Sequence, residues 1–321
     1  MPVSRSSRFF RMSRPRLPNL VIAGVGKAGT TSLFSYLAQH PDICGSSIKE
    51  VDYFTPLRYG EGLEPLAVYA GYFSHCGGER YVLEATPAYF YGGEPLITAM
   101  KKTLPADARV LVSLRDPSPR LWSYFNFMKT RLRIDKRLTL DEYLETALDL
   151  RARGMDRTRE NSPYWGLSSG FYIDYISDWF EAFGSSFRVV FFEHLVSDPR
   201  GVIEELCHWL GIHPAPAGHF SYAVENRTVL YKHKRLQRAA LELNNWAEGF
   251  LRRHPTTKDA LRRMYYRLNA RPEPTGLDER ALSRLRAVYA SSNEELAAEL
   301  SARAYHALPP WLRVREPSAL R

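Results

Sequence analysis

The stretch Asn19-Leu-Val-Ile-Ala-Gly-Val-Gly-Lys-Ala-Gly-Thr-Thr-Ser32 decides the fold, because it reads as a buried strand, a glycine-rich turn and the start of a helix. Gly24, Gly26 and Gly29 let the backbone turn tightly and bring N–H groups against a ligand. The helix that follows presents its first amides and a partial positive charge, which favour an anion. The charged and hydroxyl-bearing residues of the loop are Lys27, Thr30, Thr31 and Ser32.

Three ligand-binding interpretations compete for this loop, beside the interpretation that its glycines only pack a helix on a strand. The glycine spacing matches a dinucleotide-binding fingerprint, which also requires a second strand ending in an acidic residue about twenty residues on. Glu50 and Asp52 lie near that distance, but the Cys44-Gly-Ser-Ser47 stretch before them makes a poor strand. A Walker A loop requires a lysine directly after the last glycine, where Thr30 stands. In the third interpretation, Lys27-Ala28-Gly29-Thr30 resembles the 5′-phosphosulfate loop of sulfotransferases, whose lysine precedes a Gly-Thr pair.

The rest of the chain predicts an α/β fold. Short apolar runs rich in β-branched or aromatic residues predict buried strands at 20–23, 81–83, 110–114 and 188–192. Helical patterns follow at 33–38, after Ser118 as an N-cap, at 172–180 and at 202–210. This alternation predicts a P-loop-like central parallel sheet flanked by helices, with a helical C-terminal portion from about 234 to 300 that Pro272 and Pro274 break. We expect a basic tail at 1–17 and a single domain at 18–321.

The composition favours an anionic ligand without identifying it. Lys and Arg number 44 against 35 for Asp and Glu, so the net charge is +9. Nucleic acid, a membrane surface and a phosphorylated nucleotide all fit that sign. The chain contains no run of twenty apolar residues, and its basic N-terminal residues lack the apolar segment of a secretory signal. Cys44, Cys76 and Cys207 lie far apart in sequence, which predicts reduced thiols and a cytoplasmic location.

A second motif, Val110-Leu-Val-Ser-Leu-Arg-Asp-Pro-Ser-Pro-Arg-Leu-Trp-Ser123, separates the interpretations of the loop. Arg115 follows a buried strand, at the edge of the sheet where ligand clefts open in α/β proteins. Ser123 lies in the second turn of the next helix, which we expect to bring it back near Arg115. A guanidinium and a hydroxyl that converge at a strand end suit a phosphate group. The alternative is that Arg115 forms a structural ion pair with Asp116 or Glu84.

Together the two motifs resemble the PAPS-dependent sulfotransferase family, and specifically a bacterial-type relative of its heparan sulfate sulfotransferase branch. PAPS is 3′-phosphoadenosine 5′-phosphosulfate, and its product is PAP. The resemblance extends over most of the chain through segments at 40–42, 49–54, 86–90, 170–172 and 193–195. One departure is Ala85, which stands where the carbohydrate enzymes often have a lysine before the Thr-Pro pair.

The resemblance also implies roles for individual residues. Residues Lys27, Ala28, Gly29, Thr30, Thr31 and Ser32 would hold the 5′-phosphosulfate, and Arg115 and Ser123 the 3′-phosphate. Lys27 would also act in catalysis, at the oxygen that bridges phosphate and sulfate. Glu50 would be the general base that takes the acceptor proton. No metal is expected to take part.

The acceptor stays open at this stage. We expect a hydroxyl, before an amine, of a carbohydrate, a glycolipid or a small natural product, and no nucleic-acid partner. A homo-oligomer is compatible with the sequence. The basic residues Lys232, Lys234 and Arg235 either reach the nucleotide or begin a solvated helix. Two alternative functions are a non-catalytic anion or nucleic-acid binding protein and a Rossmann-type dinucleotide enzyme.

Overall fold

The computed structural model describes residues 16–223, 230–247, 255–271 and 277–313. Its centre is a parallel sheet whose strands have the order β2-β3-β1-β4-β5. The strands are β1 (Leu20–Gly24), β2 (Ile43–Gly45), β3 (Tyr81–Ala85), β4 (Arg109–Leu114) and β5 (Phe187–Phe191). The predicted parallel sheet and its four predicted strands are therefore confirmed. The judgement that Cys44-Gly-Ser-Ser47 makes a poor strand was wrong for Cys44 and Gly45, which pair with β3 at the edge of the sheet, whereas Ser46 and Ser47 lie beyond the strand.

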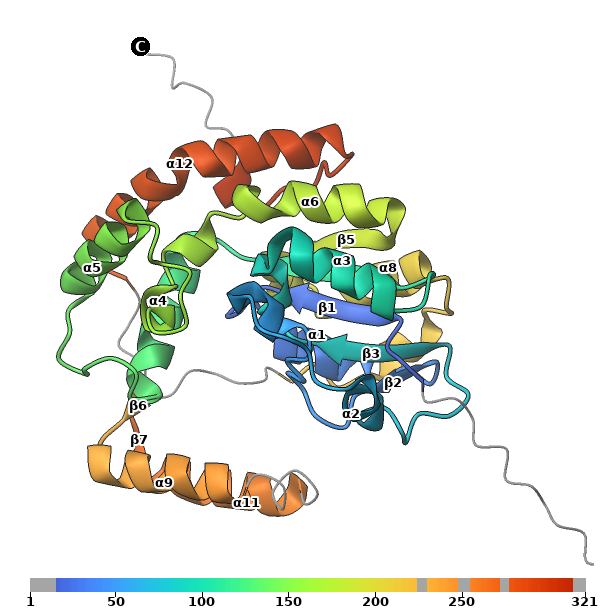
Figure 1. Ribbon diagram of the computed structural model, residues 1–321, viewed down its shortest axis with the longest axis horizontal. Coiled ribbons are helices and arrows are strands. Elements are labelled where there is room, and N and C mark those ends of the chain that lie inside the picture. The colour runs from blue at the N-terminus through green and yellow to red at the C-terminus, as the bar shows by residue number, and fades with distance from the viewer. Residues whose placement is uncertain (1–15, 224–229, 248–254, 272–276, 314–321) are drawn as a thin grey trace, which may run out of the picture.

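Helices cover both faces of this sheet (Figure 1). The helices of the described residues are α1 (Thr30–Leu37), α2 (Leu66–Gly71), α3 (Gly93–Thr103), α4 (Pro117–Thr130), α5 (Leu140–Ala152), α6 (Ile173–Phe183), α7 (Phe192–Ser197), α8 (Pro199–Leu210), α9 (Lys234–Trp246), α11 (Pro255–Asn269) and α12 (Glu279–Ala302). Alternate strand residues point to opposite faces. Val21 and Val112 therefore pack with the helices α3, α6 and α12. Leu20 and Leu111 pack with α1 and α8 on the other face.

The helical C-terminal portion is confirmed where it is described. Helices α9 and α11 lie side by side away from the sheet (Figure 1). The short strands β6 (Leu230–Tyr231) and β7 (Ala270–Arg271) pair at their base. Pro272 and Pro274, expected to break the helical region, lie outside the described residues, as do residues 1–15 of the expected basic tail. No helix in the described ranges is both long and apolar enough to cross a bilayer.

Helix α4 begins earlier than the sequence suggested. Asp116 is its N-cap and Pro117 its first residue, and the Asp116 carboxylate accepts a hydrogen bond from the Ser118 amide at 2.9 Å. The expectation that Ser118 caps the helix was wrong, because two prolines two residues apart each fit the first turn of a helix.

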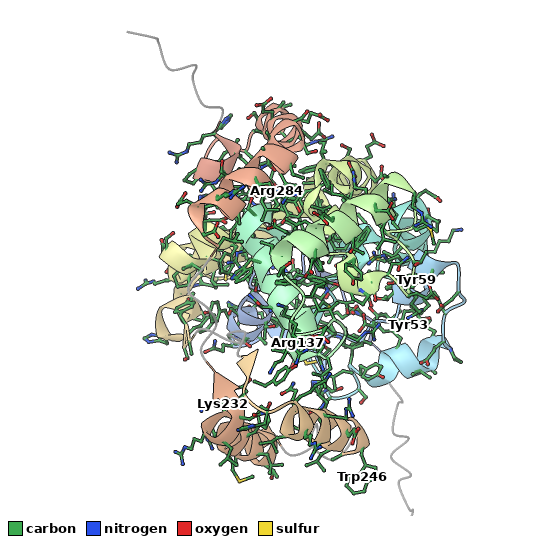
Figure 2. The ribbon with its side chains drawn as sticks, turned by 90° about the vertical axis from the view of Figure 1, so that its left-hand side faces the viewer. Tyr53, Tyr59, Arg137, Lys232, Trp246 and Arg284 are labelled. Carbon is green, nitrogen blue, oxygen red and sulfur yellow. A yellow bond between two sulfur atoms is a disulfide. The ribbon has the colours of Figure 1, made fainter. Side chains whose placement is uncertain are left out.

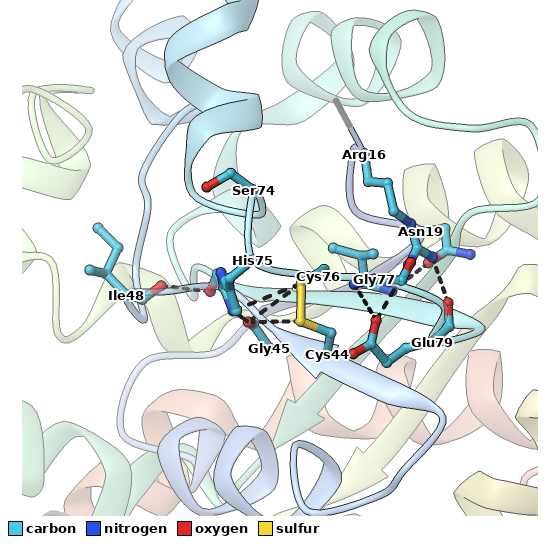
Figure 3. The surroundings of a disulfide bond; sticks show 12 residues. Arg16, Asn19, Cys44, Gly45, Ile48, Ser74, His75, Cys76, Gly77 and Glu79 are labelled. Carbon is cyan, nitrogen blue, oxygen red and sulfur yellow. Dashed lines mark hydrogen bonds and ion pairs between the residues drawn. A yellow bond between two sulfur atoms is a disulfide. The ribbon is translucent and has the colours of Figure 1, made fainter. Parts of the chain in front are cut away.

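A disulfide joins Cys44 of β2 to Cys76, which precedes β3 (Figure 3). The expectation of reduced thiols was therefore wrong for these residues, whereas Cys207 is free and buried. The two cysteines are 32 residues apart in sequence but their Cα atoms are 5.7 Å apart. Pairing of β2 with β3 brings them together, and neither their spacing nor the local sequence reveals that pairing.

Candidate active site

The glycine-rich loop after β1 is held in a conformation that only certain residues accept. Gly29, the N-cap of α1, has a left-handed backbone with φ of 76°. A Cβ atom there would lie 2.9 Å from the ring of Phe192, so glycine is required twice over. Lys27 also has a left-handed backbone, with φ of 70°, which is uncommon for a side-chain-bearing residue and typical of ligand-binding turns. The loop is anchored on β4, because the Ser113 hydroxyl donates to the Ala28 carbonyl at 2.6 Å.

The second motif contacts the first directly. The Arg115 guanidinium donates to the Lys27 carbonyl at 3.0 Å and lies 4.4 Å from the centre of the Phe192 ring. Within the described ranges, no ion pair joins Arg115 to Asp116 or Glu84, so the alternative of a structural ion pair is not observed. Burial lowers the pKa of Arg115, because the charged guanidinium is poorly hydrated there. An anionic ligand would compensate for that lost hydration.

Nearly all of the site residues predicted from the sequence line one cleft of about 1700 Å³. Of the predicted site residues, Lys27, Gly29, Thr30, Thr31, Ser32, Glu50, Arg115 and Ser123 line it. Ala28 is fully buried beneath the loop and does not. The exposed side chains of Lys232, Lys234 and Arg235 do not line the cleft either. Figure 2 shows Lys232 at the end of the molecule that the helices α9 and α11 form.

The cleft opens where the topology of the sheet changes direction. The chain runs from β1 outward to β2 and β3 and then returns to β4 on the other side of β1. Ligands of open α/β sheets bind at such a point, outside the carboxyl ends of the strands. The same order argues against a dinucleotide site, since that fingerprint places the acid-bearing second strand beside β1. Here β2 pairs with β3 instead.

Glu50 and Asp52 lie on the segment that follows β2. Both have left-handed backbones, with φ of 63° and 59°. The Glu50 amide donates to the Ala85 carbonyl at 3.0 Å, which ties the segment to the end of β3. The Glu50 carboxylate is 54% exposed and forms an ion pair with Lys49 at 2.7 Å. Glu50 therefore has both the access that a base requires and the lysine partner of a solvated ion pair.

Buried Glu84 organises this segment from beneath. Its carboxylate accepts hydrogen bonds from the hydroxyls of Thr86 at 2.8 Å and Tyr89 at 2.7 Å, and from Tyr69. The Thr86 hydroxyl in turn accepts the Asp52 amide at 3.2 Å, and the Tyr89 hydroxyl accepts the Phe54 amide at 3.3 Å. Burial raises the pKa of Glu84 to about 7 although its three hydroxyl donors lower it.

Sequence reasoning considered Glu84 only as a partner for Arg115 and missed this role. The available signal was an acidic residue inside an otherwise apolar strand, since such a residue must find partners when it is buried.

Histidines are less well placed to act as the base. His40 is buried, and its ring contacts the His213 carbonyl and the Asp42 amide, both at 3.0 Å. Neither His40 nor His194 lines the cleft. In the described part of the chain, the group with metal-ligand spacing is Cys44, His75 and Cys76, whose ligand atoms lie within 4.8 Å of one another. It lies outside the cleft, and its two sulfur atoms are joined in the disulfide.

The chain belongs to the sulfotransferase domain family, whose model matches residues 17–240. It is 28% identical over 216 residues to human heparan sulfate glucosamine 3-O-sulfotransferase 3B1, covering 66% of this chain and 50% of that protein. It is 32% identical over 151 residues to the membrane-associated sulfotransferase kil1 of Dictyostelium discoideum, covering 45% of this chain and 31% of that one.

Among solved structures, a sulfotransferase from Alicyclobacillus acidocaldarius has a TM-score of 0.56 and 25% identity, covering 70% of this chain and 89% of that one. The chain spans half or less of the length of these curated relatives. The likeness therefore concerns the catalytic fold they share.

Proposed function

We propose that this chain transfers the sulfuryl group of PAPS to a hydroxyl of a carbohydrate or carbohydrate-bearing acceptor. The observation that carries the proposal is the contact between the two motifs. The hydrogen bond from Arg115 to the Lys27 carbonyl brings two cationic side chains, from adjacent strand ends, to one cleft. A donor that carries a 5′-phosphosulfate and a 3′-phosphate requires two such positions.

The reaction requires positioning and charge stabilisation rather than covalent chemistry by the protein. The amides of residues 28–32 and the Lys27 ammonium hold the 5′-phosphosulfate at the start of α1. Arg115 and Ser123 hold the 3′-phosphate. Glu50 takes the proton of the acceptor hydroxyl as its oxygen bonds to sulfur. Lys27 stabilises the negative charge that develops on the phosphate oxygen as its bond to sulfur breaks, and no metal is needed for these steps.

The proposed acceptor class rests on the relatives, several of which are heparan sulfate sulfotransferases. The expected cytoplasmic location stays a prediction, and the Cys44–Cys76 disulfide weighs against it, because reducing compartments keep most thiols reduced.

Thermal unfolding and calorimetry with PAP, ATP and NAD test the donor. PAP at a hundredfold excess over its dissociation constant should stabilise the protein by about 2.7 kcal/mol, and ATP and NAD by far less. Equal stabilisation by ATP would refute the donor assignment. Binding of PAP without transfer of ³⁵S from labelled PAPS to any carbohydrate would favour a non-catalytic anion-binding protein.

A further inference from the structure

The helical hairpin of α9 and α11 presents an uncharged face to the cleft. Leu236 and Leu243 of α9 and Met264 and Leu268 of α11 line the cleft. None of the described residues of these two helices that line it is charged. Leu243, Met264 and Leu268 are 51%, 56% and 60% exposed. Large apolar side chains that gather in one exposed place mark a surface that binds another molecule.

The charges of the hairpin lie away from this face, although the hairpin is the most basic part of the chain. Residues 232–271 contain 11 Lys and Arg against 3 Asp and Glu, so they carry +8 of the net charge of +9. On the described parts of the helices, charged side chains such as Arg238, Glu242 and Arg263 are exposed and do not line the cleft. A helix with charge on one side and apolar residues on the other buries its apolar side against an apolar partner. The ligand of the face toward the cleft is therefore apolar.

Apolar side chains outside the hairpin line the same cleft. Phe127 and Met128 lie near the end of α4, and Val196 of α7 is 61% exposed. The Gln237 side chain of α9 donates to the Thr130 carbonyl of α4 at 2.6 Å, which holds the base of the hairpin against this helix. We name this part of the cleft the apolar groove; it is lined by Phe127, Met128, Val196, Leu236, Leu243, Met264 and Leu268.

The apolar groove is continuous with the proposed place of sulfuryl transfer. The Lys27 ammonium lies 4.8 Å from the centre of the Phe127 ring. The whole cleft, of about 1700 Å³, exceeds the roughly 300–1,000 Å³ of a typical small-molecule pocket, so a bound nucleotide leaves room for a second ligand. Because the groove begins beside Lys27, its ligand is a part of the molecule that is sulfated.

We propose that the apolar groove binds a hydrocarbon chain of the acceptor, which makes the substrate an amphipathic molecule of the glycolipid class. Its sugar hydroxyl lies beside Lys27 and Glu50, and its acyl or alkyl chain lies along α9 and α11. The proposal rests on the proposed function, since it takes the hydroxyl to be sulfated beside Lys27. Binding removes the apolar area of both the chain and the groove from water, so affinity should grow with chain length until the groove is filled.

The test uses methyl, n-butyl and n-octyl β-D-glucopyranoside, a series of probes that differ only in chain length. Calorimetry measures their affinities for the full-length, PAP-loaded protein, with the octyl compound kept below its critical micelle concentration. Each buried methylene group should tighten binding about fourfold. Burial of three of the additional methylenes of the octyl chain would therefore make it bind about sixtyfold more tightly than the methyl compound.

Variants of the hairpin assign this preference to the groove. Leu243→Gln combined with Met264→Gln replaces two exposed apolar side chains by polar ones, and should reduce the octyl preference about tenfold without changing methyl affinity. Trp246→Gln is the matched control, because Trp246 lies on the same helix as Leu243 and is 85% exposed but does not line the cleft. Figure 2 shows Trp246 at the end of the hairpin opposite Lys232. This control should keep the full octyl preference.

Equal affinity of the wild type for the three glucosides, or no binding of the octyl compound, would overturn the proposal. An unchanged preference in the double variant would do the same. Loss of the preference in Trp246→Gln would also overturn it, because the chain would then bind a surface outside the cleft. If the double variant loses as much affinity for PAP as for octyl glucoside, the groove belongs to the nucleotide and the proposal is wrong.

PAP affinity separates these results from failure of the proposed function. A wild type that binds PAP but shows no chain-length preference lacks the groove alone, whereas one that does not bind PAP refutes the donor assignment and the acceptor role of the groove with it. Thermal unfolding reports whether the double variant is folded. If it is not, Leu243→Gln and Met264→Gln decide singly, and each should lower the octyl preference by a few-fold.

Discussion

The two walls of the cleft, which we name the donor wall and the acceptor wall after the ligands proposed for them, are built by different means. The donor wall follows β1 and β4, which are neighbours in the interior of the sheet and pair with strands on both sides. The acceptor wall follows β2, a three-residue strand at the sheet edge with a partner on one side only. The segment after β2 is held in place by the Thr86 hydroxyl, which Glu84 binds, and by the Cys44–Cys76 disulfide. Interior strand ends position a backbone loop by themselves, whereas an edge strand requires side-chain and covalent support.

The largest expected effect separates the chemistry of the two walls. Glu50→Gln should lower turnover by about two to four orders of magnitude, the usual loss on removal of a general base, and should leave PAP affinity nearly intact. Lys27→Ala should lower both turnover and donor affinity, because its ammonium meets the bound phosphosulfate and the developing charge. Steady-state kinetics and calorimetry measure the two quantities separately.

The pH–rate profile gives the control for that comparison. The acidic limb of the profile, where the rate falls as the base becomes protonated, should disappear in Glu50→Gln and persist in Lys27→Ala. Turnover of Glu50→Gln within a few-fold of the wild type would remove Glu50 from the mechanism and leave it as the partner of Lys49.

The next effect tests the donor wall alone. Arg115→Ala should weaken PAP binding by about 2–5 kcal/mol, because a buried charge pair loses one member. Binding of adenosine 5′-monophosphate, which lacks the 3′-phosphate, should hardly change. Arg109→Ala, at the opposite end of β4, is the control, since Arg109 donates to the Trp209 carbonyl and lies outside the cleft. If both nucleotides weaken equally in Arg115→Ala, this arginine supports the loop rather than the 3′-phosphate.

Removal of the disulfide tests the acceptor wall. Cys44→Ser with Cys76→Ser should lower the free energy of unfolding by about 2–4 kcal/mol, because the unfolded chain regains freedom. The acceptor KM should rise more than the dissociation constant of PAP. Denaturation in urea and paired kinetic measurements check both statements, with Cys207→Ser as the control. If the acceptor KM and the dissociation constant of PAP rise by the same factor, the disulfide supports the whole sheet rather than the acceptor wall alone.

The smallest effect concerns Glu84 and pH. Its pKa is about 7 in the folded protein against an ordinary 4.5, so the folded state binds its proton more tightly than the unfolded state. The free energy of unfolding should therefore fall as the pH rises from about 4.5 to 7, by at most about 3 kcal/mol for this group, and then level off. The free energy of unfolding, measured by denaturation at several pH values across this range, should depend less on pH in Glu84→Gln. A slope that is the same in the variant would assign the dependence to other carboxyls, such as Asp52 and Asp116, whose pKa values burial also raises.

The same contrast explains what could be predicted from the sequence. The donor wall depends on local features, a buried strand followed by a glycine turn or by an arginine, and both motifs lie in the cleft as expected. The acceptor wall depends on contacts between distant residues. Cys44 and Gly45 looked unlike a strand because pairing with β3, rather than propensity, places them in one. The Cys44–Cys76 bond also joins β2 to a residue far along the chain, and one of the hydrogen bonds of Glu84 joins β3 to Tyr69 of α2. Arg58 and Trp165 are 107 positions apart in the numbering and meet only in the folded chain.

The disulfide also has a consequence for the geometry of the segment that it closes. It brings the two ends of the intervening segment together, with their Cα atoms 5.7 Å apart at the edge of the sheet. The segment between them carries both Glu50 and Arg58, so it forms a nearly closed module that displays the acceptor-facing side chains. Its buried side chains Phe54, Tyr69 and Phe73 anchor this module to the core. The disulfide and these anchors together fix the position of a segment that lines the cleft from one side.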